Sequence, residues 1–315
     1  MKRVQVLMST YHGEDYLAEQ IESILAQRQV DVSLLVRDDG SSDRTFAILK
    51  SYAGEKVQAV AGNNIGTQKS FLHLVAQADS SYDYFAFADQ DDVWHPRKLQ
   101  KAVEALEREA RKRTADDALL YAGNVWYASQ DLSVRKKQNR KIRKAPSFGN
   151  ALVENICMGC TQVFNRSLLA IVRGRLPRTG ILHDWWMYMT AAYFGTVVFD
   201  RHAYVLYRQH SGNQVGMQTA WMQRQAARLS RAGQLKGLVS AQANDFLKAY
   251  ADLLCKTAGF DTGQSRRKNE EILQIAAGYR KDMRKKLAIL RGTAVYRQDG
   301  IDQLVYKLLF GIGYL

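Results

Sequence analysis

The stretch Tyr84-Phe85-Ala86-Phe87-Ala88-Asp89-Gln90-Asp91-Asp92 passes from an apolar run directly into an acidic cluster. Its first part has the composition of a buried β-strand, and charge begins where that strand should end. Two polar clusters upstream follow strand-like segments in the same way, Ser9–Glu14 after 3–8 and Asp38–Asp43 after 32–36. Because ligands in an open α/β sheet bind at the carboxyl ends of the strands, we expect the three loops to meet in one crevice.

Strand and helix patterns alternate through the first part of the chain. This alternation is typical of a mostly parallel α/β sheet covered by helices on both faces. After residue 216 the pattern becomes helical, which predicts a helical C-terminal extension. The predicted strands are 3–8, 32–36, 57–61, 84–88, 118–121 and 196–199, and the predicted helices are 15–28, 44–53, 66–78, 96–113 (beginning at Pro96), 221–250 and 267–291.

The chain has 315 residues and a formal net charge of +14, unevenly distributed. Residues 217–315 carry 17 Lys and Arg against 8 Asp and Glu, and seven of the ten residues 135–144 are basic. Such a surplus predicts an anionic partner, which could be nucleic acid, a membrane surface or a phosphorylated substrate. No recognisable nucleic-acid-binding module accompanies the charge, which disfavours the first of these.

Cysteine content and hydropathy predict a cytoplasmic protein. Three cysteines cannot form a disulfide framework. The apolar runs are too short for a membrane span or a secretory signal. The pair Cys157 and Cys160 lacks the two further ligands of a structural zinc site, so we predict buried thiols.

The acidic cluster after 84–88 indicates a metal site. Asp89 and Asp91 are two residues apart, so their side chains can point the same way on an extended backbone. Two carboxylates that face one point repel each other unless a cation holds them, and Mg²⁺ or Mn²⁺ prefers carboxylates together with substrate phosphates. A solvated acidic turn is the alternative. A dinucleotide site is disfavoured, because no Gly-x-Gly-x-x-Gly follows the first strand.

The ordered motifs Val6–Tyr11, Val36–Asp43 and Asp89–Asp92 resemble those of the family-two glycosyltransferases over roughly residues 3–216. The resemblance implies the GT-A fold, with a nucleotide-sugar-binding part at about 1–115, an acceptor-binding part at about 116–216, and a basic helical region at 217–315. It also implies a nucleotide-diphosphate sugar donor, a divalent metal (Mg²⁺ or Mn²⁺) and inversion at the anomeric carbon.

The resemblance assigns donor-binding roles to the first two loops. Tyr11 corresponds to the aromatic side chain against the pyrimidine, and Asp39 to the carboxylate that accepts from the pyrimidine N3–H. Ser9 lies in the same nucleotide-binding loop. For Asp38, helix capping is as good an interpretation as ligand contact.

Further donor and metal residues follow from the same comparison. Asp91 corresponds to the main metal ligand, and Asp89 faces the ribose or the metal-bound waters. Asn64 and Gly66 resemble the Asn-x-Gly turn beside the donor, where glycine allows close backbone approach; an ordinary turn is the alternative.

The motif His183-Asp184-Trp185-Trp186 resembles the family's catalytic acidic motif. A positioned carboxylate can take the proton of an acceptor hydroxyl, so Asp184 is predicted to be the base. Trp185 and Trp186 either pack on the acceptor sugar or fill the core.

The segment 207–216 resembles the Tyr-Arg-Gln-His-x-x-Asn-x-x-Gly ending of bacterial rhamnosyltransferases. Arg208 would reach a phosphate, and His210 would ligate the metal or hydrogen-bond the diphosphate. The resemblance implies L-rhamnose transfer from dTDP-rhamnose in surface-polysaccharide assembly. A UDP-hexose (glucose or galactose) donor is the alternative, and a non-catalytic protein or a basic nucleic-acid-binding protein would be of another class.

The basic tail predicts contact with membrane. Basic amphipathic helices lie on anionic membranes, and the family often extends polyprenyl-diphosphate-linked saccharides. We therefore expect a peripheral position on the inner face of the cell membrane. A solvated helix surface or an oligomer interface is the alternative.

Overall fold

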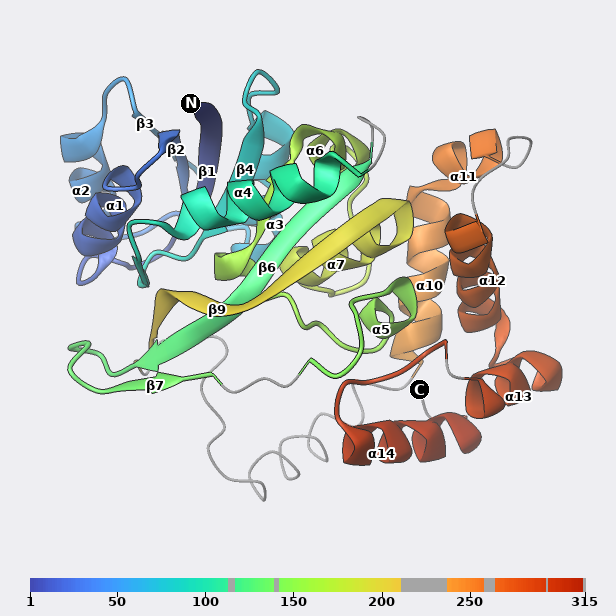
Figure 1. Ribbon diagram of the computed structural model, residues 1–315. Helices are drawn as coiled ribbons and strands as arrows, with labels where there is room; N and C mark the ends of the chain where they lie inside the picture. Colours follow the sequence, from blue (N-terminus) through green and yellow to red (C-terminus); the bar gives the residue numbers. More distant parts are fainter. Residues whose placement is uncertain (113–116, 139–141, 211–236, 258–263, 293, 314–315) are drawn as a thin grey trace. The chain divides into compact units, whose positions relative to one another are not determined.

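The computed structural model describes all residues except 113–116, 139–141, 211–236, 258–263, 293 and 314–315 (Figure 1). The chain splits into two compact units. The second unit contains the described part of the chain after residue 216, where we predicted the domain boundary. It also contains two shorter stretches from earlier in the chain. The first unit comprises the described parts of Met1–Arg140, Cys157–Gly174 and Leu182–Gln214, and the second those of Lys141–Ile156, Arg175–Ile181 and Val215–Leu315.

The first unit is built on a nine-stranded sheet with the order β3-β2-β1-β4-β8-β6-β9-β5, and β7 pairs with β6 (Figure 1). The predicted α/β architecture is confirmed. The strands are β1 (Lys2–Thr10), β2 (Val30–Asp38), β3 (Val57–Ala61), β4 (Tyr84–Ala88), β5 (Val93–Trp94), β6 (Ala118–Ala128), β7 (Arg135–Lys137), β8 (Val163–Asn165) and β9 (Gly195–Arg208).

The strands β3-β2-β1-β4 are mutually parallel, and their register aligns their carboxyl ends at one edge of the sheet. Thr10 pairs with Asp38 and Met8 with Ala88. Beyond β4 the sheet is mixed, because β8 runs antiparallel to β4 and β6, and β5 runs antiparallel to β9. The sequence pattern did not reveal β5, β7 and β8, since strands of two or three residues are too short to show a period.

Helices cover both faces of this sheet, as predicted. Alternate side chains of a strand point to opposite faces. Val6 and Met8 pack with Ile21 of α1 on one face, and on the other the ring of Phe87 lies 5.3 Å from that of Phe71 in α3. The helical elements of this unit are α1 (Leu17–Leu25), α2 (Thr45–Tyr52), α3 (Thr67–Gln77), α4 (Lys98–Ala110), η1 (Gly159–Thr161), α6 (Arg166–Val172) and α7 (His183–Phe194).

Two predicted boundaries in the first unit are corrected. The helix expected from Pro96 begins two residues later, because Arg97 is the N-cap of α4. The strands expected at 118–121 and 196–199 are much longer, since β6 and β9 pair with each other along most of their length.

The second unit is helical in its described part. The ring of Phe148 packs 5.4 Å from that of Phe246. The predicted helix 267–291 is broken, because Asp282 caps a new helix there. Of the predicted helix 221–250, residues 221–236 lie outside the described part. The helices are α5 (Phe148–Ala151), α10 (Leu238–Ala249), α11 (Ala251–Thr257), α12 (Gln264–Gly278), α13 (Met283–Arg291) and α14 (Gly300–Gly311).

Among the helices that the structure describes, none combines the length and the apolar character needed to cross a lipid bilayer.

Candidate active site

The carboxylate of Asp39 is buried directly after β2 and joins the end of that strand to the loop before α3. It accepts from the Arg37 guanidinium and from the backbone N–H groups of Ile65 and Gly66, each at 2.9 Å. A carboxylate offers about four lone-pair sites, so these three donors leave room for one more. The geometry is therefore compatible with the role predicted for Asp39 toward a pyrimidine N3–H, and it explains how the loop before α3 is held.

Asp38 closes a turn and does not cap a helix. It accepts from the Ser41 N–H at 3.0 Å, from the Ser41 hydroxyl at 2.6 Å and from the Thr10 hydroxyl at 3.1 Å. The turn needs glycine at position 40, where φ is +83° and a Cβ atom would lie 3.0 Å from the Asn64 nitrogen. At the start of α2 it is Asp43 that accepts from the Thr45 N–H.

Tyr11 follows β1, and 45% of its surface is exposed. The side chain of Gln90 clamps its backbone, accepting from the Tyr11 N–H at 2.8 Å and donating to its carbonyl at 3.0 Å. The Ser9 hydroxyl donates to that of Ser70 at 2.6 Å. The Tyr11 backbone is thus held at the strand ends, and its ring stacks on that of His12 with the centroids 4.0 Å apart. Gln90 was missed by sequence reasoning, because its partner lies 79 residues away.

Asp91 and His210 meet although they are 119 residues apart. The imidazole Nε2 lies 2.7 Å from a carboxylate oxygen of Asp91, and both side chains are mostly buried. Two residues that were predicted separately as metal-binding therefore form one group. Asn64 and Gly66, predicted beside the donor, lie in the exposed loop before α3, where Gly66 has φ +83°.

Arg208 is buried at the end of β9 and contacts protein groups on several sides. Its Nε donates to the Asp91 carbonyl at 2.8 Å, and its terminal nitrogens donate to the Gln130 carbonyl and the Glu19 carboxylate. These contacts anchor the acidic loop to β9. They give Arg208 a positioning role, and its contact with a phosphate stays a prediction.

The acidic loop also contributes to a second, more buried group of titratable side chains. Asp92 is fully buried, Cys160 is nearly so, and one ligand atom from each of Asp89, Asp92 and Cys160 lies within 4.8 Å of the others. The Lys98 ammonium, 1% exposed, lies 3.1 Å from the centroid of the Trp94 ring. Among the described residues, neither oxygen of Asp92 nor Nζ of Lys98 has a hydrogen-bond partner.

The ionisation of this group follows from its burial. Burial, together with the charges of Asp91 and Asp184, raises the pKa of Asp89 to about 7. Burial also raises the pKa of Asp92 well above its usual range, with Asp91 and Asp89 adding to the effect. It lowers the pKa of Lys98 to about 7. Sequence reasoning missed Lys98, because lysine is almost never fully buried.

These residues fit a hard divalent cation better than a thiolate-bound metal. The thiols of Cys157 and Cys160 are buried and form no disulfide, as predicted. Burial raises the pKa of the Cys160 thiol well above its usual value, and a thiol must lose its proton to bind metal. Asp91, with Asp89 beside it, instead offers the carboxylate oxygens that Mg²⁺ and Mn²⁺ prefer.

Asp184 lies in the first turn of α7 and is half-buried. Its carboxylate accepts from the Gly159 N–H at 3.1 Å and from the Trp185 N–H at 2.7 Å. Its charge contributes to the raised pKa of Asp89, so the two carboxylates are neighbours. The positive end of the helix dipole favours a negative charge here. Asp184 is therefore a fixed carboxylate beside the acidic loop, as a base requires.

Two other residues of the motif, His183 and Trp186, lie in the hydrophobic core. The His183 ring stacks on Phe71 at 3.9 Å, and burial lowers its pKa to about 3, so it is a neutral aromatic group. Trp186 has no exposed surface, which favours the core-filling alternative for this residue. Trp185 is half-buried and stays the candidate for contact with the acceptor.

Similarity to known proteins agrees with this geometry. The chain is 32% identical over 224 residues to the dTDP-rhamnosyl transferase RfbG of Shigella flexneri, a match that covers 66% of this chain and 73% of that protein. It is 34% identical over 108 residues to an uncharacterized glycosyltransferase of Nostoc, alr2836, of which it covers 33%.

The fold is shared with a solved structure. The Staphylococcus aureus protein TarS, residues 1–349, in complex with UDP-GlcNAc, aligns with a TM-score of 0.54 and 16% sequence identity, covering 99% of this chain and 91% of that chain. The sequence model of glycosyl transferase family 2 matches residues 5–171, more than half of the sequence. The chain therefore belongs to glycosyltransferase family 2, and it is a glycosyltransferase with the GT-A fold.

Proposed function

We propose that this glycosyltransferase transfers L-rhamnose from dTDP-rhamnose to a saccharide acceptor, with inversion, in the assembly of a bacterial surface polysaccharide. The observation that carries the donor assignment is the similarity to RfbG, which spans most of that protein. The exposed ring of Tyr11 beside the buried carboxylate of Asp39 supports a pyrimidine nucleotide at the strand ends.

In the proposed reaction, Asp184 takes the proton of the acceptor hydroxyl as its oxygen attacks the anomeric carbon. The bond from that carbon to the diphosphate breaks on the opposite face, so the configuration inverts and no covalent intermediate forms. A bound Mg²⁺ or Mn²⁺ supplies Lewis-acid stabilisation of the leaving diphosphate. Asp91 would hold the metal, with Asp89 beside it, and His210 would join the metal or donate to the diphosphate.

The donor assignment is tested by hydrolysis of a panel of nucleotide sugars by the purified protein. We expect turnover of dTDP-rhamnose in the presence of Mg²⁺ or Mn²⁺ and its loss with EDTA. Turnover of UDP-glucose or UDP-galactose without turnover of dTDP-rhamnose would show that the donor is a UDP-hexose, and the family assignment would stand.

We further propose a peripheral position on an anionic membrane, where a polyprenyl-diphosphate-linked acceptor is presented. The supporting observation is the exposed apolar face of α14. Ile301, Leu304, Val305 and Leu308 follow helical spacing and are 40–63% exposed, which is typical of a helix that lies in a bilayer interface. The region 217–315 has more than twice as many basic as acidic residues, which favours anionic lipid.

Vesicle sedimentation tests this position. We expect the protein to sediment with phosphatidylglycerol vesicles and not with phosphatidylcholine vesicles, and Leu304→Glu to reduce binding by roughly tenfold, since it removes buried apolar area and adds a repelled charge. Leu176→Glu, at another exposed leucine of the same unit, is the control and should bind normally. Equal binding by both variants and the wild-type protein would show that α14 does not contact the membrane.

A further inference from the structure

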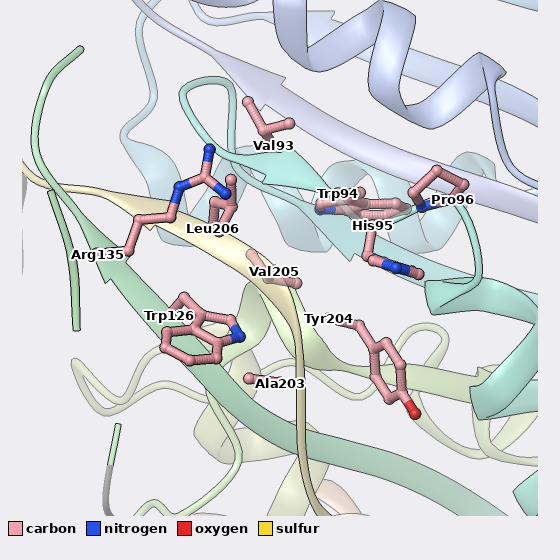
Figure 2. Close-up of a pocket in the computed structure, with 10 residues that line it drawn as sticks. All are labelled: Val93, Trp94, His95, Pro96, Trp126, Arg135, Ala203, Tyr204, Val205 and Leu206. Carbon is pink, nitrogen blue, oxygen red and sulfur yellow. The ribbon is translucent and has the colours of Figure 1, made fainter. Parts of the chain in front are cut away.

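A cavity lies on the strand pair β5–β9, close in the chain to the acidic loop. It has a volume of about 490 Å³ and lies wholly within the first unit (Figure 2). That volume is in the range of small-molecule sites. Its lining is Val93, Trp94, His95, Pro96, Trp126, Arg135, Ala203, Tyr204, Val205 and Leu206.

The lining excludes the donor as the natural occupant. Most of these side chains are aliphatic or aromatic, and none of the ten described lining residues is acidic. A nucleotide diphosphate needs several polar partners and a metal, which this surface does not offer. A hydrocarbon chain, by contrast, gains about 25 cal/mol for each Å² of apolar surface removed from water. The partly exposed rings of Trp126 and Tyr204 supply apolar faces for it.

Positive charge borders the cavity on one side. Figure 2 shows the Arg135 guanidinium beside Leu206. Arg135 begins β7, whose three residues, Arg135–Lys137, are all basic and all exposed. The carboxylate of the preceding turn, Asp131, is engaged by the hydroxyls of Ser129 and Ser133. The site therefore suits a ligand with an apolar part in the cavity and an anionic group at Arg135.

The cavity is connected to the acidic loop through very few residues. Val93 follows Asp91 by two residues, so their Cα atoms are at most about 7.6 Å apart. On the paired strand, Leu206 precedes Arg208 by two residues, and Val93 pairs with Leu206 in the sheet. A ligand that fills the cavity thus has its anionic end near the groups that hold Asp91 in place.

We propose that this cavity binds the prenyl chain of the acceptor lipid, with its phosphate at Arg135 and the following lysines. The inference rests on the proposed lipid-linked acceptor and adds the place where the carrier is held. Such a site would present the saccharide end of the acceptor to Asp184 while the diphosphate of the donor occupies the strand ends.

The test is the binding of farnesyl phosphate to the full chain, by isothermal titration calorimetry at concentrations where the probe is monomeric. We expect saturable binding by the wild-type protein. Ala203→Trp, which fills the cavity, should weaken it by roughly tenfold or more, and Ala53→Trp, at an exposed alanine, should not. Arg135→Glu should weaken farnesyl phosphate binding by about tenfold through charge reversal. Because Arg135 is exposed, this variant should fold normally, and it tests the site even if Ala203→Trp misfolds.

Three related probes separate the sources of affinity. Farnesol tests the chain without charge, inorganic diphosphate tests charge without the chain, and hexadecyl phosphate tests a linear chain. Weak binding of all three relative to farnesyl phosphate supports the proposal. Tighter binding of diphosphate or hexadecyl phosphate, or unchanged farnesyl phosphate binding by both variants, overturns it. If the wild-type protein hydrolyses a nucleotide sugar but does not bind farnesyl phosphate, the cavity assignment fails while the proposed transfer stands.

Discussion

Replacement of Asp184 by Asn should lower kcat for sugar transfer by roughly 10²–10⁴-fold, the usual contribution of a general base. Asparagine keeps the size of the side chain and one of the two oxygens that accept from the Gly159 and Trp185 N–H groups, but it cannot take a proton. The KM for the donor should therefore change little, because the residues proposed to contact the nucleotide lie on other loops. Steady-state kinetics with the donor identified by the hydrolysis panel provide both numbers.

The matched control for this variant is Asp252→Asn. Asp252 also lies in the first turn of a helix, α11, and its carboxylate pairs with Arg175 in the second unit. It should transfer sugar at the wild-type rate. If Asp184→Asn kept its kcat within a few-fold of wild type, the base would have to be another group.

Lys98→Met should destabilise the protein by about 1–3 kcal/mol, because it removes the positive charge that opposes the raised pKa of Asp89 and the contact of the ammonium with the Trp94 ring. Methionine keeps most of the volume, so packing should be preserved. The loss should be smaller than for a broken buried salt bridge, because Lys98 Nζ forms no hydrogen bond with the described residues and burial already lowers its pKa to about 7. Urea denaturation should show a lower midpoint with an unchanged slope.

A second substitution distinguishes this electrostatic cause from a packing defect. Lys98→Met combined with Asp89→Asn removes both charges, so the double variant should be more stable than Lys98→Met alone by about 1 kcal/mol. Lys101→Met, at a half-exposed lysine of the same helix that pairs with Glu104, should change stability by less than about 1 kcal/mol. Equal losses for the two lysine variants would contradict a buried role for Lys98.

The position of the candidate site could be predicted because its parts are local in sequence. Short apolar strands followed directly by polar loops at Tyr11, Asp39 and Asp89 indicated where the strands end, and the parallel pairing of β1, β2 and β4 then placed those ends at one edge. The helices α1 to α4 were predicted for the same reason, since a 3.6-residue period and turn chemistry involve only neighbours in the chain, whereas α5, α6, α7, α11 and α14 were not predicted.

What the site residues contact could not be predicted. Nothing in the sequence shows that Arg208 anchors the acidic loop or that Gln90 clamps Tyr11, because these partners are 79 or more residues apart. The burial of Lys98 could not be predicted either. A lysine at the start of a helix normally extends into water, and only the packing of α4 under the acidic loop removes it from solvent.

The sequence by itself determined the family and the alternating strands and helices from β1 to β4, and it predicted the residues from which a metal and donor site would be built. These follow from short motifs and local periods. The tertiary structure alone decided that Asp91 meets His210, that Asp39 holds the backbone of Ile65 and Gly66, and that β5 and β9 frame an apolar cavity. Such features depend on strand pairing and on the exclusion of water, which act between segments distant in the chain.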